Sequence, residues 1–259
     1  MTREDFVLLL KTLRLDADLM INRRPELENT AVFKFYYSVY VTLYDYIGDV
    51  LILVENKRFV SLPIIIRSFI DSYADFAMVV KDSKKLDNLL LRDLEDKKSA
   101  LEIKLEPIYN QISPGRVDVR KTVKDLLIIT EAEIQNLKLR SIKVLTIKER
   151  YELADLSDYY KTLYKRLSAE AHNSLTAYVN RHFAQTSKAT ASIRYDQEGS
   201  EDDLVWALVT LTEFYFRFLI LFSRAQNWKT EKLKFEQQHK DFTKMIGFQD
   251  SEEFITVNS

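Results

Sequence analysis

The residues best suited to chemistry in this sequence fall into two sets at helical spacing. In the apolar stretch 61–80, Arg67 is followed after four residues by Asp71 and after four more by Asp75. Residues four apart lie on one face of an α-helix, so these side chains predict a polar stripe along an apolar helix. An unpaired buried charge is costly, so the stripe must be paired or must face a cleft.

The second set consists of Tyr164, Ser168 and His172, again at intervals of four. Two polar stripes on two apolar helices are expected to face each other, with Asp71 accepting a hydrogen bond from His172 and orienting its imidazole. A serine nucleophile needs a base within hydrogen-bond reach, and His172 is poorly aligned for Ser168 one turn away on the same helix. The stripes predict either an acid–base site or a satisfied polar layer that fixes helix register.

Composition predicts that helices position these stripes. The 259 residues include only four glycines and four prolines, far below the usual roughly 7 % and 5 %. A sheet fold of this length needs many tight turns, and most of those turns use Gly or Pro. We therefore expect an all-α helical bundle. The glycines are far apart (Gly48, Gly115, Gly199, Gly247), which excludes the glycine-rich loops of P-loop and Rossmann proteins.

Residue counts narrow the functional classes further. The chain has no cysteine and three histidines, so we expect no disulfide, no metal site and no cofactor. Its net charge of −1 provides no general basic field for nucleic acid, so any RNA contact must be local. The best local patch is the segment 138–150, whose basic residues are Lys138, Arg140, Lys143, Lys148 and Arg150.

Hydropathy predicts a soluble, cytoplasmic protein without a membrane contact. The first ten residues contain acidic side chains and only a short apolar run, unlike a signal peptide. The most apolar later stretch, 206–222, contains Glu213 and Arg217, so we expect it to fall short of a membrane span.

Apolar periodicity predicts the helices and their order. We expect helices over 2–21, 29–55, 61–80, 81–106, 119–139, 158–183 and 201–226, and a polar one to about 245. Thr146 with Glu149 fits a capping box, and Ser157 and Ser200 are further caps. A strand or loop is expected at 191–195. The simplest division is one domain over 1–227, with a charged helical-hairpin insertion at 83–140, and a polar helix and tail over 228–259.

The motif RSFIDSYADF, with YKTLYKRLSAEAHNS later in the chain, resembles an uncharacterised family of prokaryotic helical proteins. That family of unknown function is marked by an R-S-x-x-[ED] helix and a Y-x-x-L-S-x-x-x-H helix, and the resemblance spans residues 30–225. The matching positions are Arg67, Ser68, Asp71, Tyr164, Leu167, Ser168 and His172. The resemblance implies a helical fold and candidate residues rather than one reaction.

Arg166 and His172, separated by five intervening residues, are similar to the arginine–histidine signature of HEPN ribonucleases. This resemblance implies a helical bundle that acts as a homodimer, cleaves RNA without a metal ion, and is common among toxins and abortive-infection effectors. A histidine would move the 2′-hydroxyl proton and an arginine would stabilise the phosphate charge. On a regular helix Arg166 and His172 point about 120° apart, so they converge where the helix bends or across a dimer.

Two functions follow from these patterns. The first is a metal-independent ribonuclease effector of bacterial defence or of a toxin–antitoxin system, restrained by a partner or antitoxin protein. Its candidate residues are His172, Arg166, Arg67, Asp71, Tyr164 and Ser168. The second is a non-catalytic helical module that binds a partner or senses a ligand around a buried polar layer. His172 must reach solvent in the first case and is sealed between helices in the second.

Overall fold

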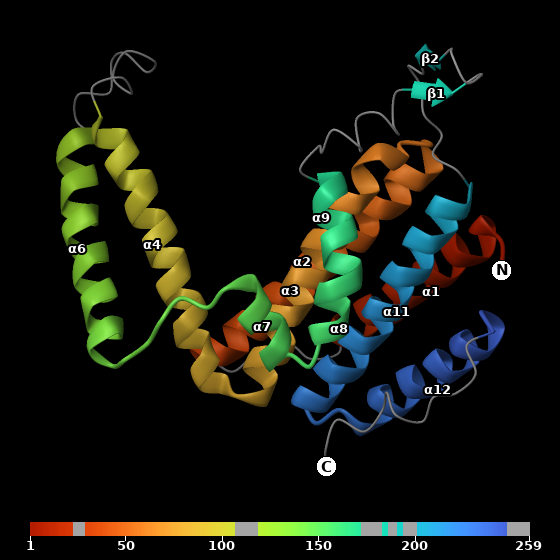
Figure 1. The fold of residues 1–259 in the computed structure, drawn as a ribbon. Helices are drawn as coiled ribbons and strands as arrows, with labels where there is room; N and C mark the ends of the chain where they lie inside the picture. Colours follow the sequence, from red (N-terminus) through yellow and green to blue (C-terminus); the bar gives the residue numbers. More distant parts are fainter. Residues whose placement is uncertain (23–28, 107–118, 172–182, 186–190, 194–200, 248–259) are drawn as a thin grey trace. The chain divides into compact units, whose positions relative to one another are not determined.

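The computed structural model describes residues 1–22, 29–106, 119–171, 183–185, 191–193 and 201–247 (Figure 1). Helices account for nearly all of these residues, so the expected all-α class is confirmed. The chain divides into two compact units. The first comprises Met1–Ala77 with Asp158–Ser259, and the second comprises Met78–Ser157. The predicted hairpin 83–140 falls in the second unit.

Long helices form the first unit. They are α1 (Arg3–Asn22), α2 (Ala31–Glu55), most of α3 (Leu62–Lys81), α11 (Glu201–Ala225) and α12 (Lys229–Met245), with the shorter η1 (Phe59–Ser61), α8 (Ser157–Tyr159), a π turn (Tyr160–Tyr164) and α9 (Lys165–Ala171). α11 packs against α1, α2 and α12. The polar helix α12 thus lies along α11 within the same unit.

Aromatic rings fill the core between α2, α3 and α11. The ring of Phe76 on α3 packs edge-on against Tyr36 of α2 and Phe218 of α11, with ring centroids 5.1 Å apart in both pairs. Tyr40 of α2 lies 4.8 Å from Phe222 of α11. Such rings bury large apolar areas in preferred edge-on and offset geometries. The aromatic-rich segment of α2 is therefore core, and it holds α3 and α11 in place.

Local signals in the sequence explain several helix ends. The Thr30 side chain accepts a hydrogen bond from the Phe33 amide and caps α2, and Pro63 stands in the first turn of α3, where its missing N–H costs nothing. The predicted boundaries agree with the observed ones to within one or two residues for α1, α2, α3, α11 and α12. The helix expected at 119–139 is α6 (Val119–Leu139) and matches its predicted ends. The helix expected at 81–106 is α4 (Leu86–Leu105), which begins five residues later than predicted because α3 continues to Lys81 and a 3-10 turn follows. The expected cap Ser200 lies outside the described residues.

One pair of very short strands accompanies the helices in the described part of the chain. β1 (Phe183–Gln185) pairs antiparallel with β2 (Ala191–Ile193), with Phe183 opposite Ile193. Of the strand or loop expected at 191–195, the strand is present over residues 191–193. The helix expected to end at residue 183 does not include Phe183, which pairs with Ile193 in β1.

The second unit centres on a helical hairpin. α4 (Leu86–Leu105) packs along α6 (Val119–Leu139), and Figure 1 shows them side by side. Between them lies a small core of Leu91, Leu94, Ile134 and Leu137. η2 (Ser83–Lys85) precedes the hairpin and α7 (Ile147–Leu153) follows it. The capping box of α7 is present as expected, since Thr146 and Glu149 each accept a hydrogen bond from the other's amide.

Two helices are long and apolar enough to cross a membrane by length and composition alone, α2 and residues 204–225 of α11. Our expectation that the second stretch falls short of a span is wrong by this measure. About half of each helix is buried inside the protein, and Tyr40 of α2 packs on Phe218 of α11. A core helix has the same apolar character, so the cytoplasmic location stays a prediction.

Candidate functional site

Two of the predicted site residues meet between helices of the first unit. Arg67 on α3 donates a hydrogen bond from Nη2 to the Oη of Tyr164 in the π turn, over 2.9 Å. The Arg67 guanidinium carbon also lies 5.0 Å from the centre of the Tyr164 ring, within range of a cation–π interaction. One member of each polar stripe is therefore in contact, although the two residues are 97 positions apart in the sequence.

Asp71 completes this group, which we call the Arg67 cluster (Arg67, Asp71 and Tyr164). The Asp71 Oδ2 is 3.8 Å from the Arg67 Nε, a loose ion pair one helical turn along α3. The side chains of Arg67 and Asp71 are 17 % and 25 % exposed. The cluster is thus half-buried and within reach of solvent. Asp75, the third member of the stripe, is buried.

A π turn positions Tyr164. The helix is α-helical over Ser157–Tyr159, widens to a π turn over Tyr160–Tyr164, and returns to α-helix at Lys165. Within the turn the rings of Tyr160 and Tyr164 stack, with centroids 5.1 Å apart. Single π turns inside α-helices occur frequently at functional sites. No breaker residue in YKTLY predicts this one.

Arg166 packs against α11. Its guanidinium carbon is 4.0 Å above the ring of Trp206 on α11. α9 stays a regular α-helix to Ala171, so the described part shows no bend after Arg166. Ser168 is half-buried on the same helix. His172, His182 and the expected contact between Asp71 and His172 lie outside the described residues.

Our sequence reasoning missed a second polar group in the first unit, which we call the Glu213 cluster (Glu213, Arg217 and His239). Arg217 Nε donates to Glu213 Oε1 over 2.6 Å, and His239 Nε2 lies 2.6 Å from Glu213 Oε2. The side chains of Glu213 and Arg217 are each 20 % exposed. The spacing of four between Glu213 and Arg217 is visible in the sequence, whereas His239 is on a separate polar helix and no spacing relates it to the other two.

Neighbouring groups tune the Glu213 cluster. Burial favours a higher pKa for Glu213, but the hydrogen bond from His239 and the charge of Arg217 outweigh it and hold that pKa below the ordinary value. Burial raises the pKa of Tyr73, on α3, to about 12. Arg217 also lies 5.4 Å over the ring of Tyr159. The carboxylate thus stays ionised at neutral pH while the nearby phenol of Tyr73 stays protonated.

The basic segment 138–150 offers little unpaired positive charge. Four of its basic residues form ion pairs, and Arg150 is buried. The pairs are Lys138–Glu95, Arg140–Asp87, Lys143–Glu149 and Lys148–Glu152. The hydrogen bonds from Lys143 and Thr146 lower the pKa of Glu149 to about 2. RNA binding through this patch stays a prediction. Because its basic side chains are paired or buried, the structure favours basic side chains outside the segment as contacts for RNA.

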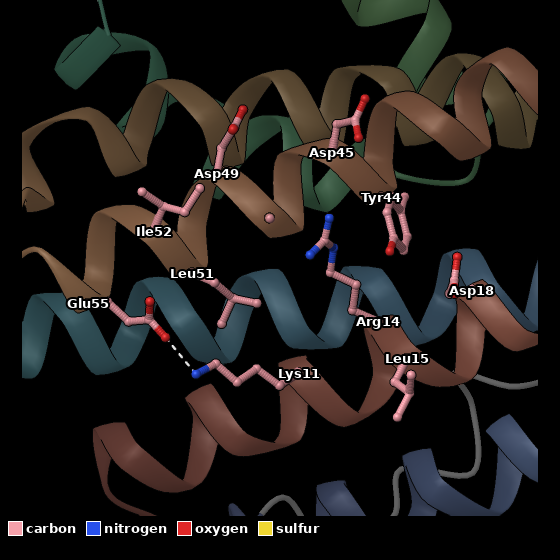
Figure 2. A pocket seen from close by; sticks show the side chains of 11 residues that line it. Lys11, Arg14, Leu15, Asp18, Tyr44, Asp45, Asp49, Leu51, Ile52 and Glu55 are labelled. Atoms are coloured by element: carbon pink, nitrogen blue, oxygen red, sulfur yellow. Dashed lines mark ion pairs between the residues drawn. The ribbon is translucent and has the colours of Figure 1, made fainter.

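A pocket of about 650 Å³ opens between α1 and α2 (Figure 2). Arg14 reaches from α1 toward α2 and lies 4.2 Å over the ring of Tyr44. A Cβ at Gly48 would stand 3.0 Å from the Arg14 Nη2, so glycine at this position makes room for the guanidinium. The rim carries the ion pair Lys11–Glu55, at 2.5 Å. Among the predicted site residues that the structure describes, none lines this pocket.

No three His, Asp or Glu side chains gather as metal ligands among the residues that the structure describes. The Arg67 cluster has one carboxylate, and the Glu213 cluster has one carboxylate already held by an arginine and a histidine. Neither arrangement resembles the oxygen- and nitrogen-rich donor sets that hold divalent cations. In both clusters the arginine can bind an anionic group through hydrogen bonds, and the carboxylate can accept a proton.

The fold and the Arg67 cluster define an all-helical protein with an arginine–tyrosine contact joining two distant helices. Residues 35–190, more than half of the chain, match the sequence model of DUF5677, a family of unknown function, and the chain belongs to that family. The expected membership of such a family is thereby confirmed. The matched stretch includes the whole Arg67 cluster. No match was found among curated proteins or among solved structures.

Proposed function

We propose that this protein is a HEPN-like ribonuclease that cleaves RNA without a metal ion. The observation that supports the proposal is the hydrogen bond between Arg67 and Tyr164, because it joins the two motif helices at a half-buried position open to solvent. A guanidinium has five N–H donors in a planar fork. It is therefore suited to contact a phosphate while it is oriented by a tyrosine and an aspartate.

The proposed reaction is an intramolecular transfer at phosphorus. The 2′-oxygen of one ribose attacks the adjacent phosphorus atom, the bond from phosphorus to the 5′-oxygen breaks, and a cyclic phosphate and a 5′-hydroxyl form. His172 takes the 2′-hydroxyl proton, and the imidazolium so formed returns a proton to the departing 5′-oxygen. Arg67 stabilises the extra negative charge on the phosphate, and Tyr164 and Asp71 hold its guanidinium in position. Arg166, the arginine of the HEPN-like signature, is the alternative phosphate partner.

The same proposal covers the biological setting that the HEPN resemblance implies. The protein would act as a homodimer in the cytoplasm, as an effector of bacterial defence or of a toxin–antitoxin system, restrained by a partner protein. The support for this setting is the motif of Arg166 and His172 and the membership of a helical family. Expression of the wild-type chain should then slow bacterial growth, and His172→Ala should relieve the effect.

The test is cleavage of a fluorogenic RNA by purified protein in EDTA. We expect Arg67→Ala to reduce the rate about 100-fold, and His172→Ala at least as much. Arg14→Ala is the matched control, because Arg14 is also a half-buried arginine over a tyrosine ring but belongs to neither motif. Absence of cleavage by folded wild-type protein, or equal rates for Arg67→Ala and Arg14→Ala, would overturn the proposal.

A second candidate is a helical module that binds a ligand or a partner without catalysis. The pocket between α1 and α2 favours it, because its volume and its mixed charged and apolar lining suit a small molecule or a few side chains of a partner. In that case the Arg67 cluster only fixes helix register. Arg67→Ala then lowers the melting temperature, and neither it nor the wild type cleaves RNA.

A further inference from the structure

Three buried polar atoms around the pocket between α1 and α2 have no hydrogen-bond partner in the described part of the chain. They are the Nε of Arg14 and the hydroxyl oxygens of Tyr40 and Tyr215. The two tyrosines are 3 % and 1 % exposed. Each of the three groups can donate a hydrogen bond. Since buried polar groups nearly always have partners, these three require an explanation.

The two hydroxyls lie close to side chains that line the pocket. Burial raises the pKa of Tyr215, and the phenol of Tyr44 and the charge of Arg14 also act on it. Burial likewise raises the pKa of Tyr40, and Tyr215 and Tyr44 add to that increase. Arg14 and Tyr44 both line the pocket. The three donors are therefore grouped on its inner side, where α1 and α2 pack against α11.

Arg14 is held so that its guanidinium reaches into the pocket. Figure 2 shows the side chain extending from α1 toward α2. The guanidinium carbon lies 4.2 Å over the ring of Tyr44, and Gly48 leaves the space that the Nη2 atom occupies. A guanidinium donates hydrogen bonds and cannot accept them. A ligand that pairs with it must therefore carry acceptor oxygens, as a carboxylate does.

Carboxylates stand at the rim of the same pocket. Asp45 and Asp49 are exposed and Asp18 is half-buried, and no ion pair or hydrogen bond joins them to another described residue. Figure 2 shows Asp45 and Asp49 on α2, extending away from Arg14. These carboxylates disfavour a ligand that is only anionic, and Arg14 disfavours one that is only cationic. A ligand with one group of each sign suits both the inner side and the rim.

We propose that this pocket binds an α-amino acid with an apolar side chain. Its carboxylate contacts Arg14, its ammonium group faces the aspartates of the rim, and its side chain packs on Leu15, Leu51 and Ile52, which also line the pocket. The volume of about 650 Å³ is in the range of small-molecule sites. The proposal gives the second candidate function its class of ligand, and it does not rest on ribonuclease activity.

Isothermal titration calorimetry of the full chain with L-leucine and L-phenylalanine tests the proposal. We expect at least one of them to bind with a Kd of about 1 mM or below. Isocaproate and hydrocinnamate are the same two molecules without the ammonium group, and isoamylamine and phenethylamine lack the carboxylate. Each analogue should bind at least about tenfold more weakly than its parent. Absence of binding by both amino acids, or an analogue that binds as tightly as its parent, would overturn the proposal.

Variants of the pocket provide a second readout. Arg14→Gln removes the charge and should weaken binding at least about tenfold. Gly48→Ala keeps Arg14 but sets a methyl group 3.0 Å from its Nη2, so the guanidinium must shift and binding should weaken while the protein stays folded. Lys11→Gln is the matched control, because Lys11 also lines the pocket but pairs with Glu55, and its affinity should stay within about twofold. Equal affinities of Arg14→Gln and Lys11→Gln contradict the proposal. RNA cleavage is not measured here, so failure is distinguishable from failure of the proposed ribonuclease.

Discussion

The Arg67 and Glu213 clusters are built from the same parts and differ in how the parts are joined. Each has an arginine and a carboxylate four residues apart on one helix, and a tyrosine near the arginine. Exposure does not separate them, since all four charged side chains are 17–25 % exposed. The difference is at the carboxylate. Glu213 is held at 2.6 Å by both Arg217 and His239, whereas Asp71 lies 3.8 Å from Arg67.

This difference indicates different roles. In the Glu213 cluster the carboxylate is the shared partner of two cationic or hydrogen-bonding groups, so removing it leaves both without their acceptor. In the Arg67 cluster the arginine is the shared partner, of an aspartate and of a tyrosine from another helix. A carboxylate that two partners hold, as in the Glu213 cluster, contributes to stability. An arginine that two partners hold, as in the Arg67 cluster, is oriented to bind an anion. The predictions below test that distinction.

The largest effect is expected from Glu213→Ala. It leaves the Arg217 guanidinium and His239 part-buried without their common acceptor, and the free energy of unfolding should fall by about 3 kcal/mol. Denaturant unfolding followed by circular dichroism measures the change. Asp71→Ala is the matched control on α3 and should change far less. Similar losses for the two variants would remove the basis of the comparison.

The next effect concerns the proposed activity of Arg67. Arg67→Lys keeps the positive charge but loses the planar fork that can hold a tyrosine and a phosphate together. We expect RNA cleavage to slow about tenfold, equivalent to about 1.4 kcal/mol of barrier, with an unchanged melting temperature. The rate in EDTA and a thermal melt of the same sample provide both readouts. A lysine variant that melts early but cleaves at the wild-type rate would assign Arg67 to stability.

Much of the fold was predictable because it depends on local pattern. Apolar residues at helical spacing predicted α1, α2, α3, α4 and α6, and the capping box of Thr146 and Glu149 predicted where α7 begins. The π turn was not predictable, because the segment 160–164 contains no residue that breaks a helix. On its two sides, Tyr159 packs on Phe214 and Tyr164 contacts Arg67. The extra residue that widens the helix to a π turn is therefore associated with tertiary contacts rather than with a signal in the local sequence.

The candidate site was predictable only in part. Spacing identified Arg67 and Tyr164 and suggested that their helices meet, and the structure brings these two residues together. The Glu213 cluster depends on α12 folding back along α11, a long-range contact that no spacing reveals. The ion pairs of the basic segment 138–150 were not predictable for the same reason, since the acidic partners of Lys138 and Arg140 are on α4. Counting charge along a chain misses charge on the neighbouring helix.

A smaller effect is expected from pH. The pKa of Glu213 in the folded protein lies below its ordinary value of 4.5, so the ionised carboxylate stabilises the fold at neutral pH. That contribution is lost as pH falls below 4.5 and through the lowered folded pKa. The stability difference between wild type and Glu213→Gln should therefore be largest near pH 7 and shrink in acid. A difference that stays constant from neutral pH down through this window contradicts an ionised Glu213.

The smallest effect separates the two carboxylates directly. Asp71→Asn removes the charge from a loose, partly exposed pair, and such pairs contribute less than about 1 kcal/mol. We expect the melting temperature to stay within error of the wild type, because the contact of Arg67 with Tyr164 does not involve Asp71. RNA cleavage should fall severalfold, because Asp71 no longer helps to orient the guanidinium. If stability falls as far as in Glu213→Gln, the two clusters serve the same structural purpose, and the loose geometry of Asp71 carries no functional meaning.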